Sequence, residues 1–273
     1  MKLYNYQGAE VLDSNDFGSN DFINYDRTIK GIAHRGYSAI APENTLPAYK
    51  LAKKMGFFYV ETDVSFTVDD VPVLLHDSTI DRTSNGTGAI ADLTLEQVRE
   101  YDFGSWKNSD YTGTKIPTFE EFIDLCKALG LHPYIEIKTD QTYTQAQVES
   151  LVDIVRAHGM KGKVTWLSFS DVYLGYVKNY DSNANIGYVV FTVAATDITK
   201  AQALKTANNS VMIDARLSTL TSSMVELCYN ADIPLEVWIL DTKSGFATLN
   251  PYITGVTSDN LIAGKVLYET NLE

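Results

Sequence analysis

Two short stretches of the sequence place charged side chains at alternate positions. Glu61 and Asp63 lie in the run FFYVETDV, and Glu136 and Lys138 lie in the run PYIEIK. Side chains two residues apart on a β-strand point to the same face, so each run brings two charges to one side of its strand. An unpaired buried charge costs several kcal/mol, so these carboxylates require a cation.

That cation is either a metal ion or an arginine or lysine side chain. The carboxylates of Glu61, Asp63 and Glu136, without a cysteine among them, are typical ligands for a hard cation. The sequence therefore predicts one divalent metal ion, Ca²⁺ or Mg²⁺, and not a structural zinc site. The alternative is a buried network of salt bridges that does no chemistry.

The chain contains four histidines, two of which end apolar runs. His34 and His76 are predicted to face the metal site, where they provide a general acid and a general base near neutral pH. His132 lies at a helix-to-strand junction and His158 at a helix end, so both are predicted to be surface or capping residues.

Fixed positive charge accompanies these groups. Arg35 directly follows His34, and Lys138 shares a strand face with Glu136. Both cations suit an oxyanion such as a phosphate. A metal ion, two histidines and two cations around an oxyanion indicate phosphoryl transfer.

The elements that position these residues alternate along the chain. Eight apolar runs are predicted to be buried strands, at residues 29–34, 57–64, 133–138, 163–169, 185–190, 210–215, 234–240 and 253–258. Amphipathic segments between most of them predict helices, which together favour a closed (β/α)8 barrel. The alternative is an open doubly wound sheet, but its glycine-rich G-x-G-x-x-G turn is not found.

Helical spacing of apolar residues is clearest in residues 44–56, 118–130 and 142–159. Thr118 is a predicted N-cap, and Gly130 and Gly159 are predicted C-terminal stops. Residues 66–117 break the alternation and predict an insertion between strand two and helix two. It contains the extra apolar run VPVLLHD, a polar loop and a short helix near LTLEQVREY. Loops that follow strands build the active face of such barrels.

Composition limits the remaining possibilities. Of 273 residues, 45% are hydrophobic, which suits one large folded domain at residues 29–273 after a polar leader or linker at 1–28. A formal net charge of −13 argues against nucleic acid and anionic membranes as partners. Cys126 and Cys228 are predicted to be small buried side chains. Without a membrane-length apolar stretch, the protein is expected to be soluble, either cytoplasmic or extracellular, with its oligomeric state open.

In combination, these residues resemble the glycerophosphodiester phosphodiesterase family over about residues 30 to 265. The matching motifs are His34-Arg35-Gly36, Pro42-Glu43-Asn44-Thr45, Glu61-Thr62-Asp63-Val64, Pro72-Val73 leading to His76-Asp77, Asp81-Arg82-Thr83, Ile116-Pro117-Thr118, Glu136-Ile137-Lys138, and Trp238 in VWIL. Each motif alone is weak, but their order and spacing together are specific.

The resemblance implies a barrel with an insertion after strand two and a set of residue roles. Glu61, Asp63 and Glu136 would bind the metal ion, and His34 and His76 would be the catalytic histidines. The substrate would be held by Arg35 and Lys138 at its phosphate and by Trp238 beside its glycerol. In the implied mechanism, the glycerol hydroxyl next to the phosphate attacks it, one histidine removing its proton and the other protonating the leaving alcohol. The cyclic phosphate is then hydrolysed to glycerol phosphate.

The alcohol side departs from the family pattern. After the tryptophan, where the family often has Thr-Val-Asn, the chain reads Ile239-Leu240-Asp241. The substrate is therefore left open between a small diester, such as glycerophosphocholine, and the poly(glycerol phosphate) of teichoic acid, acted on by a secreted or phage-tail enzyme. Trp238 is alternatively a core residue. A phospholipase D of the spider-toxin type lacks its expected disulfides here, and a silent barrel used for binding is disfavoured because all the catalytic groups are present.

Overall fold

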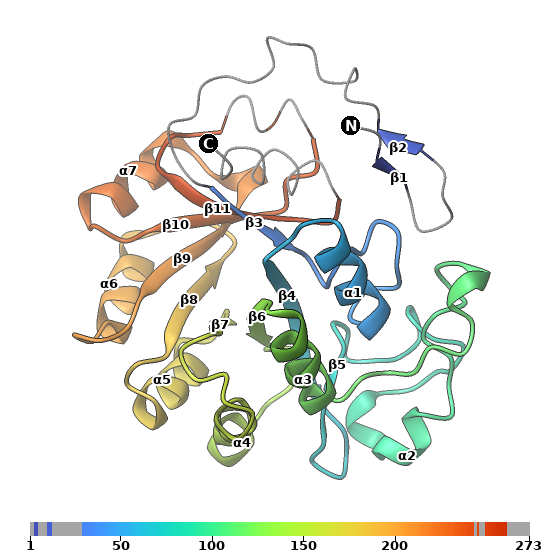
Figure 1. Ribbon diagram of the computed structural model, residues 1–273. Coiled ribbons are helices and arrows are strands. Elements are labelled where there is room, and N and C mark those ends of the chain that lie inside the picture. Colours follow the sequence, from blue (N-terminus) through green and yellow to red (C-terminus); the bar gives the residue numbers. More distant parts are fainter. Residues whose placement is uncertain (1–2, 5–9, 13–28, 243–244, 246–248, 261–273) are drawn as a thin grey trace.

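A computed structural model of the protein describes residues 3–4, 10–12, 29–242, 245 and 249–260. Eight parallel strands close into a barrel, and helices surround it on the outside (Figure 1). The strands follow one another around the barrel in chain order, and the first pairs with both the second and the last. The predicted (β/α)8 barrel is confirmed, and the open sheet is excluded because the ring is closed.

Each predicted apolar run overlaps one barrel strand. The strands are β3 (Lys30–Ala33), β4 (Tyr59–Phe66), β6 (His132–Ile137), β7 (Thr165–Ser168), β8 (Asn185–Val190), β9 (Val211–Arg216), β10 (Leu235–Trp238) and β11 (Ile253–Ser258). Most of their residues are buried on both faces, which explains why the runs are nearly continuous apolar stretches.

The predicted leader is described only in part. A short antiparallel pair, β1 (Leu3–Tyr4) and β2 (Glu10–Leu12), lies within it. The other residues of 1–28, like residues 261–273 at the opposite end, lie outside the described residues. The division into leader and barrel domain therefore stays a prediction.

The helices on the outside of the barrel pack through the predicted apolar faces. They are α1 (Leu46–Lys54), α3 (Phe119–Leu129), α4 (Gln145–Ala157), α5 (Asp171–Tyr180), α6 (Ala195–Leu204) and α7 (Ser222–Asn230), with a 3₁₀ turn, η4 (Leu217–Thr219), before α7. Thr118 caps α3 by accepting from the Glu121 N–H, and Gly130 ends it in the left-handed conformation. Gly159 has a φ of 70° and lies one residue beyond the α4 cap.

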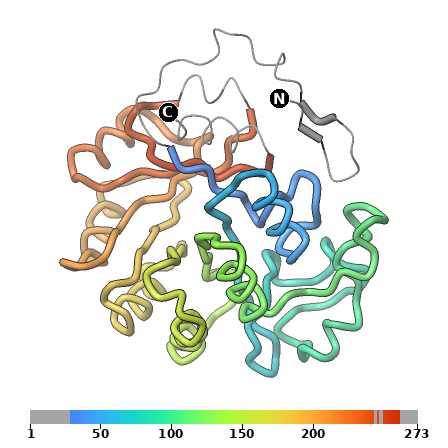
Figure 2. Tube along the Cα trace, in the orientation of Figure 1, coloured from blue at the N-terminus to red at the C-terminus, as the bar shows by residue number. Residues whose placement is uncertain are grey.

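The insertion after β4 forms a small lobe beside the barrel (Figure 2). It begins with β5 (Pro72–Leu74), which is antiparallel to β4, and continues through η2 (Ile90–Asp92), α2 (Leu95–Val98) and η3 (Ser109–Tyr111). Seven buried residues give it an apolar cluster of its own: Val73, Leu75, Ile80, Ile90, Val98, Phe103 and Ile116. The lobe therefore has a core separate from that of the barrel.

Inside the barrel lies a cluster of apolar side chains. Its buried members are Ile32, Tyr134, Leu167, Val189 and Met212. The two cysteines are also buried and unpaired, as predicted. No helix in the described part of the chain is both long enough and apolar enough to cross a bilayer.

The prediction for His132 as a surface or capping residue is only partly correct, because its side chain is half-buried. His132 begins β6 at the amino-terminal end of the barrel, where it lines a cavity together with Tyr59, Tyr134 and Lys30. Its Nε2 lies 3.0 Å from Thr165 Oγ1. Because its ring packs against Tyr59 of the neighbouring strand, its position at a junction leaves it only partly exposed. His158, by contrast, caps α4 as predicted.

Burial at this end of the barrel makes His132 a source of acid sensitivity. Desolvation, with a smaller contribution from Lys30, lowers the pKa of His132 to about 4 from 6.5. The unfolded chain therefore binds more protons as the pH falls below 6.5, so this contribution to stability is present near neutral pH and lost on acidification.

We expect His132→Gln to reduce the acid sensitivity of folding. Between about pH 7 and pH 5, the free energy of unfolding should fall by roughly 1 to 2 kcal/mol less in this variant than in the wild type. Urea titrations at the two pH values measure the difference. Equal slopes with pH in the two proteins would contradict a neutral, buried His132.

Candidate active site

Three buried carboxylates meet at the carboxyl-terminal end of the barrel. Glu61 and Asp63 lie on one face of β4, and Glu136 is the register partner of Asp63 on β6. One oxygen from each side chain lies within 4.8 Å of the other two. Glu61 Oε1 is buried without a hydrogen-bond partner. The structure thus brings the predicted ligands together, and an unsatisfied oxygen within an all-carboxylate set fits a hard divalent cation.

Two cations close this carboxylate cluster. The backbone N–H of Arg35 donates to Glu61 Oε2 at 2.9 Å. The guanidinium Nε of Arg35 lies 3.1 Å from Asp63 Oδ2. Lys138 Nζ lies 2.9 Å from Glu136 Oε1 and 3.3 Å from Asp63 Oδ1. Both predicted phosphate-binding residues therefore face the cluster, where an anion bound at the metal would meet them.

The charges of this group do not balance. Three carboxylates face two cations, and burial, followed by the charges of Asp63 and Glu136, raises the pKa of Glu61 well above its usual value. Burial alone would raise the pKa of Asp63 too, but Arg35 and Lys138 bring it below the usual range. A bound divalent cation would supply the missing positive charge and keep Glu61 ionised.

A tight turn after β3 aims Arg35 at the cluster. Arg35 has a φ of 55° and Gly36 a φ of 79°, both in the left-handed region. A Cβ at position 36 would lie 2.7 Å from the carbonyl carbon of Ala48, so only glycine fits. This geometry explains why glycine follows the His-Arg pair.

His34 is held in a single orientation at the same turn. Its Nδ1 lies 2.6 Å from Asp259 Oδ1, and Ser38 Oγ donates to the same oxygen at 2.9 Å. An ionised carboxylate only accepts, so Nδ1 carries the proton and Nε2 is left to face the cluster, 4.0 Å from Glu61 Oε2. Burial alone would raise the pKa of Asp259, but its bonds with His34 and Ser38 lower it, so it stays ionised.

His76 approaches from the insertion. It follows β5, and its Nδ1 lies 2.6 Å from Asp77 Oδ1. Partial burial would raise the pKa of Asp77, but Arg82 and His76 lower it to about 2. His76 also lines a small pocket together with Asn44, which donates to Asp63 Oδ2. Both predicted catalytic histidines are thus paired with a carboxylate, and His34 lies beside Glu61 of the cluster.

Trp238 lies at the opposite side of the barrel mouth. It ends β10, packs against the apolar cluster inside the barrel, and is only partly buried. Its ring also meets Phe169 and Phe191. The alternative prediction, that Trp238 is a core residue, is therefore half correct. The side chain packs against the barrel interior but is not fully buried. Its place beside a glycerol stays a prediction.

Comparison with known proteins decides the family. The glycerophosphoryl diester phosphodiesterase family matches residues 34–263, a span that begins at His34 and includes all the groups above. The chain belongs to the glycerophosphoryl diester phosphodiesterase family. The predicted family is confirmed, and with it the enzyme class.

Relatives of this phosphodiesterase agree with that membership. A glycerophosphodiester phosphodiesterase of Bacillus subtilis is 37% identical over 142 residues, which are 48% of this chain and 47% of that protein. One of Caldanaerobacter subterraneus is 28% identical over 84% of this chain and 93% of its own length. A phosphodiesterase of Oleispira antarctica, solved with the product sn-glycerol-3-phosphate, is 25% identical with a TM-score of 0.78, covering 90% of this chain and 98% of that one. The match to the Bacillus protein therefore covers about half of that protein's length.

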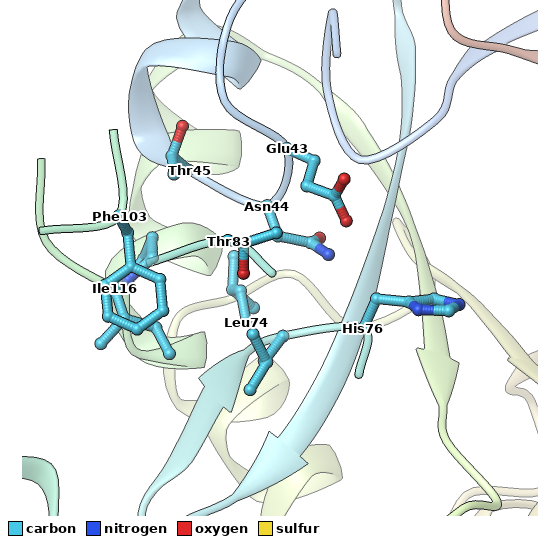
Figure 3. A pocket seen from close by; sticks show the side chains of 10 residues that line it. Glu43, Asn44, Thr45, Leu74, His76, Thr83, Phe103 and Ile116 are labelled. Atoms are coloured by element: carbon cyan, nitrogen blue, oxygen red, sulfur yellow. The ribbon is translucent and has the colours of Figure 1, made fainter. Parts of the chain in front are cut away.

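Several residues that complete the phosphodiesterase site had no role assigned from the sequence. Asn44 donates to Asp63 Oδ2 at 2.8 Å and accepts from Tyr49, so it fixes the carboxylate. Glu43 bridges Arg35 and Arg82. Glu43, Asn44 and His76 also line a small pocket, and Figure 3 shows Phe103 and Ile116 on its other side. The residues that line the pocket are Glu43, Asn44, Thr45, Leu74, Leu75, His76, Thr83, Phe103, Ile116 and Pro117.

The sequence contained a signal for these residues and for the two carboxylates that orient the histidines, Asp77 and Asp259. Glu43 and Asn44 stand in the Pro-Glu-Asn-Thr motif, and Asp77 follows His76 in the His-Asp pair. Asp259 ends a Thr-Ser-Asp run, but its partner His34 is 225 positions away in the chain. Motifs alone do not show which residues contact each other across that distance.

Proposed function

We propose that this phosphodiesterase is metal-dependent and cleaves glycerophosphodiesters to glycerol phosphate and an alcohol, through a cyclic phosphate and with two histidines transferring protons. The observation that carries the proposal is the pairing of the carboxylate cluster with His34 and His76, each oriented by its own carboxylate. A salt-bridge network without chemistry needs neither histidine and leaves Glu61 Oε1 unsatisfied.

The metal would be held by Glu61, Asp63 and Glu136. When bound, it polarises the phosphate and stabilises the negative charge that develops on the phosphoryl oxygens. Arg35 and Lys138 exchange part of their contact with the carboxylates for the non-bridging oxygens of the phosphate. The side chain of Arg35 also stays bonded to Glu43, which keeps the guanidinium in place.

The two histidines then act on opposite ends of the substrate. One imidazole removes the proton from the glycerol hydroxyl next to the phosphorylated carbon, and that oxygen attacks phosphorus. The other protonates the leaving alcohol. Because Asp259 and Asp77 accept from the Nδ1 atoms, each histidine uses Nε2. In the second stage, water opens the cyclic phosphate to glycerol phosphate, the type of product held by the Oleispira relative.

Intramolecular attack has a strong physical basis. A hydroxyl held next to its phosphorus has an effective molarity of about 10⁵ M or more. The described residues place no serine, threonine or cysteine hydroxyl or thiol within hydrogen-bond distance of His34 or His76, so no nucleophile of the protein is activated there.

An analogue that lacks the neighbouring hydroxyl separates this mechanism from direct attack by water. The deoxy analogue should bind, because Arg35, Lys138 and the metal still meet the phosphate, but it should not be cleaved. Glycerol phosphate release, compared with that from the normal diester, measures the effect. Direct attack by water predicts loss of only a hydrogen bond, about 1 to 3 kcal/mol. Near-normal turnover of the analogue would therefore refute the cyclic intermediate while leaving the metal site intact.

A further inference from the structure

The wall of the barrel mouth that faces the carboxylate cluster is aromatic. Phe169 and Phe191, which follow β7 and β8, stack with ring centroids 4.8 Å apart. Trp238 meets their edges at 6.1 Å and 5.8 Å. Phe191 is 56% exposed, so this aromatic wall, formed by Phe169, Phe191 and Trp238, opens to solvent.

A charged residue, Arg216, lies beside this wall. It ends β9 as the register partner of Trp238, and its guanidinium lies 6.0 Å from the centre of the Trp238 ring. The two-residue repeat of the strand places it on the same face as Met212 and Asp214, toward the barrel interior. The side chain is exposed.

This arginine has no ion-pair partner in the described part of the chain. Arg35, Lys138 and Arg82 each contact at least two carboxylates, whereas no carboxylate comes within 4.0 Å of Arg216. In a protein with a net charge of −13, an unpaired cation at the mouth of the site is unusual. A cation–π contact with the indole at this distance leaves the N–H groups of the guanidinium available to an anion.

The inner face of β9 lies across the barrel from the strand that carries Glu61 and Asp63. Asp214 lies two residues, about 7 Å along the strand, before Arg216. In the closed ring of strands, β9 lies four strands from β4, so inward side chains of the two strands face each other across the barrel. A diester whose phosphate meets Arg35 and Lys138 can therefore extend one of its ends toward Arg216.

We propose that Arg216 determines substrate specificity by binding a second anionic group of the substrate, beyond the phosphate that is cleaved. The enzyme then prefers glycerophosphodiesters whose alcohol bears a phosphate or a carboxylate. The inference rests on the proposed function and narrows its substrate class. A quaternary ammonium headgroup is disfavoured, because Arg216 already covers the Trp238 ring and repels a second cation.

Two sources supply such an oxyanion. One is the next phosphate of a poly(glycerol phosphate) chain, and the other is a carboxylate such as that of glycerophosphoserine. The test measures kcat/KM for four diesters: glycerophosphoglycerol, the same compound with a terminal phosphate, glycerophosphoserine and glycerophosphocholine. A preference confined to the terminal phosphate identifies a polymer-type substrate, and a preference that includes the serine diester identifies a general oxyanion site.

The expected result is a preference of about tenfold for the phosphate-bearing alcohol over glycerophosphoglycerol, as one charge-assisted hydrogen bond provides. Arg216→Gln should bring this ratio close to one, and Arg216→Lys should keep part of it. Arg156→Gln is the matched control, because Arg156 also lies over an aromatic ring, Tyr180 at 4.4 Å, but on the outer surface. Its ratio should equal that of the wild type.

Three results would overturn the inference. They are a wild type that favours glycerophosphocholine, an Arg216→Gln variant that keeps the wild-type ratio, and an Arg216→Lys variant that loses as much as the Gln variant. In the last case the packing of the guanidinium matters and its charge does not. If none of the diesters is cleaved, the proposed function fails as well, and this outcome is distinct from cleavage without a preference.

Discussion

Replacing Glu61 by glutamine should abolish both metal binding and turnover. The change keeps the size of the side chain but removes the charge that completes the carboxylate cluster. Because a metal ion supplies several kcal/mol of transition-state stabilisation, kcat should fall by at least about 10³-fold. Asp63→Asn and Glu136→Gln should behave in the same way.

The same variant separates a metal site from a network of salt bridges. Ca²⁺ or Mg²⁺ should raise the melting temperature of the wild type, since a ligand that binds only the folded state stabilises it, and this rise should be lost in Glu61→Gln. Without metal, the variant should be at least as stable as the wild type, because burial disfavours the charged form of Glu61. A salt-bridge network predicts the opposite, a loss of stability that added metal does not alter.

Asp214→Asn provides the matched control for the metal experiment. Asp214 is also buried, with an oxygen that lacks a hydrogen-bond partner, but it lies outside the group of three ligands. The rise in melting temperature that added metal causes in the wild type should remain in the Asp214→Asn variant. Full activity of Glu61→Gln in excess chelator would show that the metal hypothesis is wrong.

His34→Ala and His76→Ala should each lower kcat by about 10² to 10⁴-fold, the usual contribution of a positioned acid or base. Circular dichroism should show that both variants remain folded, because each imidazole lies at the edge of the site and not in an apolar core. A leaving group of low pKa needs no proton, so only the variant that lacks the general acid should recover activity on a p-nitrophenyl diester. This comparison assigns the two roles, which the geometry leaves symmetrical.

His158→Ala is the control for the histidine experiment. His158 is also bonded to a carboxylate, with its Nδ1 2.5 Å from Asp124 Oδ1, but it lies at the outer surface. Its rate should remain close to that of the wild type. If His158→Ala or His132→Ala loses as much activity as His76→Ala, the assignment of the catalytic histidines is wrong.

The sequence was sufficient for the elements and for the residues that share a strand. Alternation along one strand places Glu61 beside Asp63, and apolar spacing identifies all eight barrel strands. What alternation does not give is the register between strands, which makes Asp63 the neighbour of Glu136. Their charge and their predicted place at strand ends grouped the three carboxylates as one metal site, and the family resemblance implied the same roles.

Residues that act through a partner were harder to predict. Asp259 matters only through His34, and Arg216 is notable only because the strand register places it against Trp238 and away from every described carboxylate. The half-buried position of His132 was missed for a related reason. Its exposure depends on a contact with Tyr59 of the neighbouring strand β4, and this contact is not visible in its own segment.

The separate core of the insertion has a consequence for how the protein loses activity. His76 belongs to a lobe whose apolar cluster of seven residues is much smaller than that of the barrel. Parts of a protein with few buried contacts open more often than the rest, without global unfolding. Mild heating or low denaturant would then release His76 first, and amide protons of β5 would exchange with solvent before those of β7. Inactivation would reflect the lifetime of this lobe, while the barrel beside it is still intact.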